Sequence, residues 1–408
     1  AWLDLSTGAF LVQTIDFTNV GTVLSRIEPS EILITESSLA SCDLFATPGP
    51  WKNLFTFVPE ITPDKNIAIS KFEEFFKNGD TDFLYGLSNS ELFSCVVLFD
   101  YLVITQKGTI HNLQEPVKFE DSNIMLIDDA TRKNLELTKT LDGSREGSFL
   151  NNIDFTKTGG GGRKLHSWLS APLFNTQAIG QRLDSVAFFF GGQKERSFLQ
   201  QQFREFPDIE RAIGRLSMNR GAPRDLARVK NGLVVGKNVR SHIPTVGLPK
   251  LIKSALENLD KNEDLIDILT DALLEDLPVL AKDGGFIKTG FSQELDELRA
   301  IMSDSQGMIN ELQQKYANSE EIPNLKIKFN RMLGYFIETT KRHGDILLLN
   351  NEVFIHRQTI KNAVRFSTEE LISLEGKIST ATEKALAIEL AIFETIVSKV
   401  ISKKEKIL

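Results

Sequence analysis

Residues 323–366 read PNLKIKFNRMLGYFIETTKRHGDILLLNNEVFIHRQTIKNAVRF, a stretch that interrupts an otherwise helical pattern. Over residues 325–329, apolar side chains alternate with lysines, which predicts a strand with one apolar face. Residues 335–339 are rich in aromatic and β-branched side chains and predict a second strand. We therefore expect a small β module here, inserted into helical sequence.

Helical patterns flank this β module on both sides. From 293 to about 318, apolar residues recur with a helical period, Ser292 is a suitable N-cap, and acidic residues occupy the first turn. At 1.5 Å per residue this helix would be roughly 40 Å long. The second helix is predicted to begin with a capping box between Ser367 and Glu370. Its apolar residues over 371–392 are spaced by three and four, so we expect the two helices to pack lengthwise with the β module at their far end.

The remainder of the chain divides into an α/β part and an all-α part. Strand patterns at 2–5, 9–12 and 31–35, with a helical pattern at 68–76, predict an α/β domain. Beyond about residue 120 helical periodicity prevails, with breaks such as the glycines at 159–162, which we interpret as a turn. The expected fold class is multidomain, α/β plus all-α, with boundaries at 1–115, 116–322, 323–366 and 367–408.

Composition excludes several classes of protein. The chain has 408 residues, of which 41% are hydrophobic, so two or three domains are expected. Its longest apolar run, residues 92–104, contains Asp100 and is too short to span a membrane. The two cysteines, Cys42 and Cys95, lack the spacing of a zinc site or a disulfide framework. Without a signal-peptide pattern, we expect a cytoplasmic location and a piece of a longer protein.

Charge is distributed unevenly. The chain has a formal net charge of −8, yet residues 323–366 contain eight basic and three acidic residues and therefore carry +5. This asymmetry predicts contact with a polyanion, although solvated lysines that protect an edge strand are an alternative explanation. His343 and His356 have no second ligand at metal spacing and are interpreted as surface or packing residues. The basic residues are Lys326, Lys328, Arg331, Lys341, Arg342, Arg357, Lys361 and Arg365.

Short segments along the whole chain resemble, in order, those of the MutS family of bacterial DNA mismatch-recognition proteins. The segments at 334–338 and 357–363 resemble the family's clamp, and those at 283–285 and 294–298 resemble the start of its descending lever helix. Further segments resemble the family's helical core, namely residues 127–137, 154–165, 168–169, 172–173, 182–184, 208–211 and 222–226.

The resemblance implies a connector domain of RNase H-like topology, a helical core with long lever helices, and a β clamp inserted between the levers. It also implies a DNA mismatch repair scaffold whose clamp binds the backbone of double-stranded DNA without sequence preference. For the intact protein it implies a dimer and a MutL-like downstream repair partner that contacts the connector. The residues favoured for DNA contact are Lys341, Arg357, Gln358, Thr359, Lys361 and Asn362, followed by Arg331 and Arg342.

The chain departs from the family pattern in two ways. No G-x-x-x-x-G-K-[ST] phosphate loop occurs, so we expect no ATPase activity and no cofactor in this chain, with ATP and Mg only in the intact protein. The family's mismatch-reading motif, G-x-F-x-E, is matched by its letters at 334–338. In this order of segments, we interpret these residues as a clamp strand.

Two other functions remain open. Asp4, with Glu36 and Asp100, suggests an RNase H-like metal-dependent nuclease, which needs three or four converging carboxylates. Nothing in their spacing requires convergence, and Asp4 is more simply a cap for its own turn. Alternatively, the chain is a protein-interaction scaffold that does not bind DNA, and the basic module is incidental.

Overall fold

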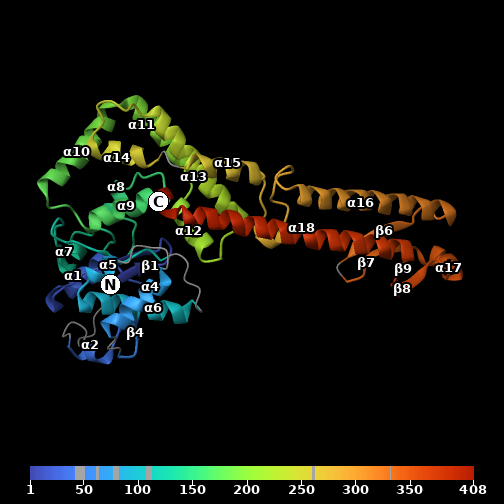
Figure 1. Ribbon diagram of the computed structural model, residues 1–408, viewed down its shortest axis with the longest axis horizontal. Helices are drawn as coiled ribbons and strands as arrows, with labels where there is room; N and C mark the ends of the chain where they lie inside the picture. Colours follow the sequence, from blue (N-terminus) through green and yellow to red (C-terminus); the bar gives the residue numbers. More distant parts are fainter. Residues whose placement is uncertain (42–50, 61–63, 77–81, 107–112, 260–261, 331) are drawn as a thin grey trace. The chain divides into compact units, whose positions relative to one another are not determined.

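The computed structural model describes residues 1–408 except 42–50, 61–63, 77–81, 107–112, 260–261 and 331, so Cys42 and Arg331 lie outside the described residues. The chain divides into two compact units. Unit 1 comprises Ala1–Asp267 and Lys399–Leu408, and unit 2 comprises Ile268–Ser398. Both are mostly helical with small sheets (Figure 1).

The N-terminal part of unit 1 is α/β, as predicted. Strand β1 (Trp2–Asp4) pairs antiparallel with β2 (Ala9–Val12), and Gly8 in the turn between them has a φ of +79°, where a side chain would be strained. Strand β5 (Val117–Lys118) pairs parallel with β2, and β3 (Ile32–Ile34) pairs parallel with β4 (Phe55–Phe57). The helices here are α1 (Val20–Ile27), α2 (Glu36–Ser41), α4 (Lys65–Phe75), α5 (Asp82–Tyr85) and α6 (Asn89–Thr105).

Helix α6 supplies much of the core of this α/β part. Ser88 and Glu91 form a capping box at its start, which satisfies two backbone N–H groups that the helix itself leaves unpaired. Cys95 lies on its buried face, in the same cluster as Phe10 and Phe72. Burial raises the pKa of the Cys95 thiol to about 12, so this cysteine is a packing residue rather than a reactive thiolate.

The rest of unit 1 is helical. The glycines at 159–162 were expected to form a turn, but they form the first turn of a helix. The reason is local, because the Thr158 hydroxyl accepts a hydrogen bond from the Gly161 N–H (2.9 Å) and caps that helix. The helices are α7 (Asp129–Asn134), α8 (Phe149–Ile153), α9 (Gly159–Ser170), α10 (Thr176–Gly191), α11 (Gln193–Glu205), α12 (Ile209–Ser217), α13 (Pro223–His242), α14 (Lys250–Asn258), α15 (Glu263–Ala272) and α19 (Lys404–Ile407), with α15 continuing into unit 2.

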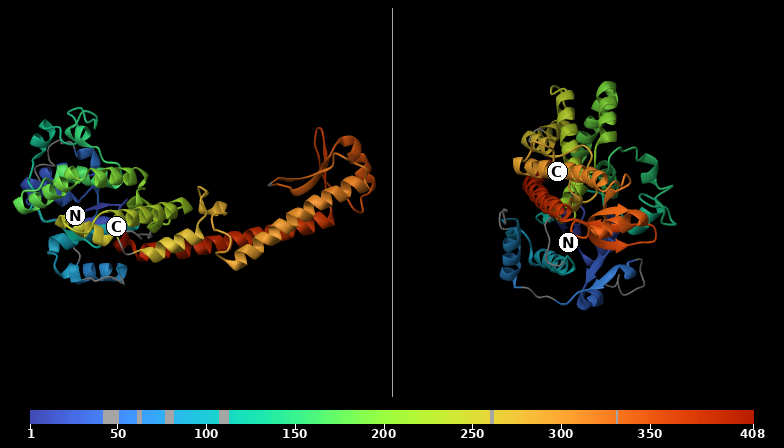
Figure 2. Two further views of the ribbon diagram at one scale, coloured as in Figure 1. Left: turned by 90° about the horizontal axis from the view of Figure 1, so that it is seen from above. Right: turned by 90° about the vertical axis from the view of Figure 1, so that its right-hand side faces the viewer.

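Unit 2 contains the two long helices, α16 (Gln293–Ser319) and α18 (Glu369–Ser402), which lie side by side in Figures 1 and 2. Ser292 caps α16 as predicted, accepting a hydrogen bond from the Leu295 N–H. The predicted cap of α18 is wrong by one residue. Thr368 accepts the hydrogen bond from the Leu371 N–H (3.1 Å), because Ser367 is still paired in the last strand of the sheet.

The β module is a four-stranded antiparallel sheet with one helix, inserted between α16 and α18. Its strand order is β6-β7-β9-β8, so β6 and β8 are the edges. Both predicted strands form, although Phe329 at the end of the first is 59% exposed rather than buried. The elements are β6 (Lys326–Asn330), β7 (Gly334–Thr339), α17 (Lys341–Leu349), β8 (Ile355–Thr359) and β9 (Val364–Ser367).

One face of the sheet shares a hydrophobic core with the two long helices. Ile337 and Phe366 of the sheet lie in one buried cluster with Leu312 of α16 and Leu371 of α18. Gly334 has a φ of +70°, and the Glu375 carboxylate of α18 occupies the space that a Cβ would take there. The β module is thus fixed to both helices by one face of its sheet.

Candidate nucleic-acid interface

The edge strand β8 carries three of the residues predicted to contact DNA. All five of its residues are exposed. The pairing with β9 shifts between His356 and Gln358, so Arg357 is the extra residue of a β-bulge and faces no partner residue. Bulges at sheet edges re-aim a side chain, and here the bulge leaves the Arg357 guanidinium exposed.

The side chains of Gln358 and Thr359 already have partners within the sheet. Gln358 Oε1 accepts a hydrogen bond from Arg365 Nη1 (2.9 Å). Thr359 Oγ1 lies 2.9 Å from His356 Nε2, within hydrogen-bond distance. These two residues therefore support the edge strand, while Arg357, which precedes them, and the nearby turn remain open to a ligand.

The turn that follows β8 presents Lys361 and Asn362. The Ile360 N–H donates to the Ala363 carbonyl (2.9 Å), which closes the turn, and both intervening side chains are exposed. A closed turn holds its backbone in one conformation, so the ammonium of Lys361 is displayed from a defined position rather than from a loose loop.

Helix α17 contributes Lys341 and Arg342, which are exposed in its first turn. That turn contains no acidic residue, and Thr340 makes no side-chain capping hydrogen bond. Cations at a helix N-terminus are not stabilised by the helix dipole. An anion there is attracted both by the dipole and by the two side-chain cations. Gly344 packs against Val364 of β9, so α17 belongs to the same module as the exposed edge.

One carboxylate neutralises part of the module's positive charge. Glu338 of β7 pairs with Lys328 (2.6 Å) and Arg365 (3.0 Å), and the hydrogen bond from Lys328 is the main cause that lowers the pKa of Glu338. The Arg365 guanidinium also lies over the Phe336 ring, 4.6 Å from its centroid. These two cations are therefore structural, a distinction that the charge count alone did not reveal.

Five cations of the module have no such partner. In the part of the chain that the structure describes, no carboxylate lies within 4.0 Å of the charged nitrogens of these side chains. Lys326 was not among the residues favoured for DNA contact. Its alternation with Lys328 along β6 could have indicated that its side chain is exposed. Arg331 lies outside the described residues. The five are Lys326, Lys341, Arg342, Arg357 and Lys361.

The segment that matches the G-x-F-x-E motif is a strand, β7, as interpreted from the order of segments. Phe336 is buried and Glu338 is ion-paired, so neither is free to stack on a base or contact one. His356 bonds within the sheet, and the described residues contain no group of three His, Cys, Asp or Glu side chains arranged to hold a metal ion.

The acids considered for a nuclease do not form a site. Asp4 accepts hydrogen bonds from the Ser6 N–H (2.8 Å) and the Ser6 hydroxyl (2.7 Å), which confirms its interpretation as a turn cap. Asp100 pairs with Lys71 (2.7 Å). Glu36 begins helix α2 and is exposed.

No helix among the described residues combines the length and the apolar character needed to cross a lipid bilayer. With the geometry of the module in place, comparison with known proteins identifies the family. Residues 1–114 match the family described as MutS domain II, and residues 130–408 match the one described as MutS domain III.

Several curated relatives align with essentially all of the chain. The DNA mismatch repair protein MutS of Roseobacter denitrificans is 38% identical over 409 residues, which is 100% of this chain and 46% of that protein. The same figures hold for the MutS protein of Ruegeria pomeroyi. That of Rhodopseudomonas palustris strain BisB18 is 37% identical over 410 residues, covering 98% of this chain and 44% of that protein. The chain spans about half the length of these relatives, and it belongs to the MutS family.

Proposed function

We propose that this chain is the DNA-gripping scaffold of a mismatch repair protein, and that its β module is a clamp that binds the backbone of double-stranded DNA. The observation that carries the proposal is the group of five exposed, unpaired cations within a chain of net charge −8. Phosphate contacts of this kind position a protein on DNA without reading the sequence. Affinity should therefore be the same for matched and G·T-mismatched duplexes.

Helices α16 and α18 would then act as levers that support the clamp. The buried side chains of Ile309, Leu312 and Tyr316 on α16 and of Leu371 on α18 pack into the core of the β module, so a displacement of either helix must move the sheet. In the longer protein, these helices would couple DNA binding to ATP hydrolysis. The sequence of this chain contains no phosphate-loop motif, so we propose that the chain itself does not hydrolyse ATP.

Residues 1–115 would be the connector, with RNase H-like topology, residues 116–322 the core with the first lever, and residues 367–408 the second lever. For the longer protein we further propose a cytoplasmic location, a dimer, and contact of the connector with a MutL-like repair protein. The family membership supports these assignments.

Salt-dependent DNA binding tests the clamp. The logarithm of the affinity for a duplex should fall linearly with the logarithm of salt concentration, because each neutralised phosphate releases counterions. Arg357→Ala and Lys361→Ala should weaken binding equally for all sequences and each reduce the slope by roughly one. Fluorescence anisotropy with a labelled duplex at several salt concentrations measures this slope.

A matched control is Lys384→Ala, which removes an exposed cation of α18 outside the β module and should leave the slope unchanged. Unchanged slopes for Arg357→Ala and Lys361→Ala, or no binding even at very low salt, would favour the scaffold that does not bind DNA.

A further inference from the structure

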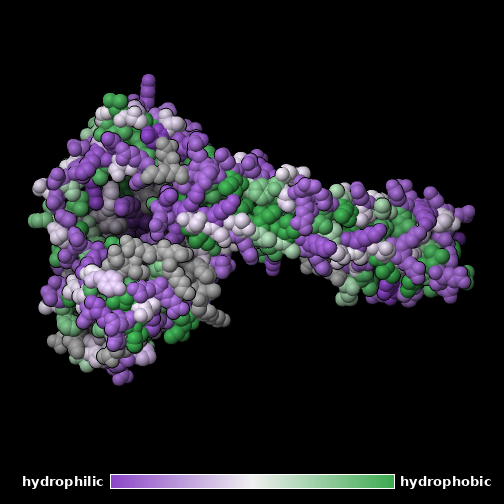
Figure 3. Space-filling view, in the orientation of Figure 1, coloured by the Kyte–Doolittle hydropathy of each residue, from purple (hydrophilic) through white to green (hydrophobic). Residues whose placement is uncertain are grey.

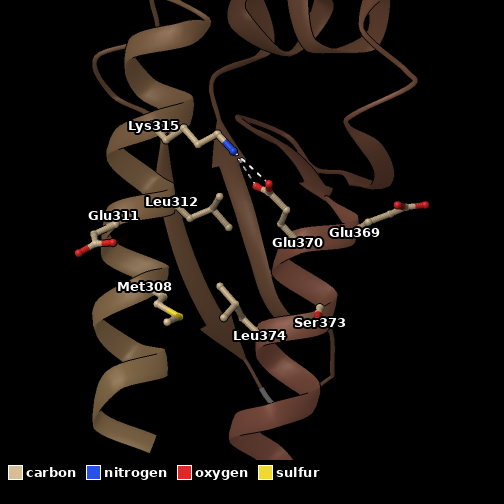
Figure 4. A pocket seen from close by; sticks show the side chains of 8 residues that line it. All are labelled: Met308, Glu311, Leu312, Lys315, Glu369, Glu370, Ser373 and Leu374. Atoms are coloured by element: carbon tan, nitrogen blue, oxygen red, sulfur yellow. Dashed lines mark hydrogen bonds and ion pairs between the residues drawn. The ribbon is translucent and has the colours of Figure 1, made fainter. Parts of the chain in front are cut away.

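Unit 2 contains a second surface whose charge is opposite to that of the clamp face, the surface of the β module that carries the five unpaired cations. An open groove of about 710 Å³ runs between α16 and α18 near the β module. Figure 4 shows the Met308 and Leu312 side chains reaching toward Leu374 from the opposite helix. These three apolar side chains line the inside of the groove.

Another exposed apolar side chain of α16 lies beyond the groove. Met308 is 51% exposed, and Ile301, seven residues earlier and therefore on the same side of the helix, is 47% exposed. Both belong to a helix that is held on α18 by ion pairs at two levels, Arg299 with Glu389 and Lys315 with Glu370. Green patches interrupt the hydrophilic surface of the two long helices in Figure 3. Exposed apolar side chains beside a groove, on helices held together in this way, are typical of an interaction surface.

Acidic side chains border the groove. Glu311 and Glu369 project away from it in Figure 4, and both are exposed. The third, Glu370, is bound by Lys315, with both carboxylate oxygens 3.0 Å from the ammonium. Since the lysine neutralises only one of three carboxylates, the lining carries a net negative charge. This surface repels a nucleic acid and attracts a cationic ligand.

We propose that this groove docks a basic amphipathic helix of a partner protein. The apolar face of such a helix would cover the exposed Met308 and the half-buried Leu374, as in other helix-in-groove complexes, while Leu312 is buried in the core of the β module and supports the floor of the groove. Its lysines or arginines would lie against Glu311 and Glu369. The charge of the groove selects the partner, and the clamp face, which is positive, would remain available for DNA.

A model peptide tests the proposal on the complete 408-residue chain. The probe is a fluorescein-labelled peptide of two Leu-Lys-Lys-Leu-Leu-Lys-Leu repeats, which forms a basic amphipathic helix, and binding is followed by fluorescence anisotropy. We expect the double variant Glu311→Lys/Glu369→Lys to weaken binding by about tenfold or more. Leu374→Ser should weaken it as well, because it places a hydroxyl in the apolar lining.

Both glutamates are exposed, so their replacement should leave the fold intact, as circular dichroism would verify. Glu383→Lys makes the same change of charge at an exposed residue of α18 outside the groove and should leave the affinity within about twofold. A peptide with glutamate in place of lysine should not bind. Wild-type affinity in both groove variants, or an equal loss in Glu383→Lys, would overturn the proposal.

Discussion

The helical part of unit 1 and the β module of unit 2 use charged residues in opposite ways. In the helical part, Asp225 is bound by Arg215 (2.6 Å) and Arg228 (2.7 Å), and Arg163 binds both Asp208 and Glu210. In the β module, cations such as Arg357 and Lys361 have no carboxylate near them in the described part of the chain. Paired charges join helices to one another, whereas unpaired exposed charges are available to an external ligand.

The difference has an energetic cause. A carboxylate withdrawn from water loses its hydration, and only nearby cations and N–H groups compensate for that loss. An exposed arginine keeps its hydration when the protein folds, so it needs no carboxylate partner. Removing a charge should therefore have a large effect on stability in the helical part and a small one at the clamp face.

The largest effect is expected at Asp225. Its side chain is only 5% exposed, and it also accepts a hydrogen bond from the Ala222 N–H (3.1 Å) at the start of α13. Asp225→Ala should lower the free energy of unfolding by about 3 kcal/mol, because it leaves two arginines and a backbone N–H without their shared acceptor. Urea denaturation measures this. A loss below about 1 kcal/mol would mean that buried pairing is not what holds these helices.

The next largest effect concerns acid stability. Glu28, the residue after α1, contacts His166 (3.8 Å), Lys139 (2.5 Å) and Thr138 (2.7 Å) of the helical part. Its interaction with His166, followed by those with Lys139 and Thr138, lowers the pKa of Glu28 to about 2. Because this pKa lies below that of the unfolded chain, near 4.5, the stabilisation is complete above pH 4.5 and disappears as the pH falls toward 2.

We expect this contribution to be about 1–2 kcal/mol, since the side chain is partly exposed and water screens the pairs. Glu28→Gln should therefore lower the unfolding free energy at pH 7 and reduce its decline between pH 5 and pH 3. The exposed Glu257→Gln is the control and should leave the profile unchanged. A wild-type acid profile in Glu28→Gln would show that the cluster does not contribute.

The smallest effect is expected within the β module, where the comparison can be made between two arginines. Arg365→Ala removes the ion pair with Glu338 and the contact with Phe336, and should cost about 1–2 kcal/mol of unfolding free energy. Arg357→Ala, at the bulge, should change it by less than about 0.5 kcal/mol. Thermal or urea unfolding compares the two. Equal losses would mean that the bulged arginine has a structural partner.

Local patterns in the sequence were sufficient for the two long helices and two of the strands of unit 2, whereas α17, β8 and β9 were not predicted. The alternation at 325–329, the aromatic and β-branched run at 335–339 and the cap at Ser292 each depend on neighbours in the chain, and each predicted element forms. The family segments, taken in order, likewise indicated MutS before any geometry was known. The errors were also local, because a strand that continues through Ser367 moves the helix cap to Thr368.

The sequence by itself determined the family, the types of elements and the excess of positive charge in residues 323–366, since all three depend on residue identity and spacing along the chain. Only the tertiary structure decided which cations are free. Glu338 reaches Arg365 because β7 and β9 pair, and Arg357 is left exposed because β8 bulges against β9. Ion pairing depends on distances of a few ångströms between residues far apart in the chain, and folding alone sets those distances.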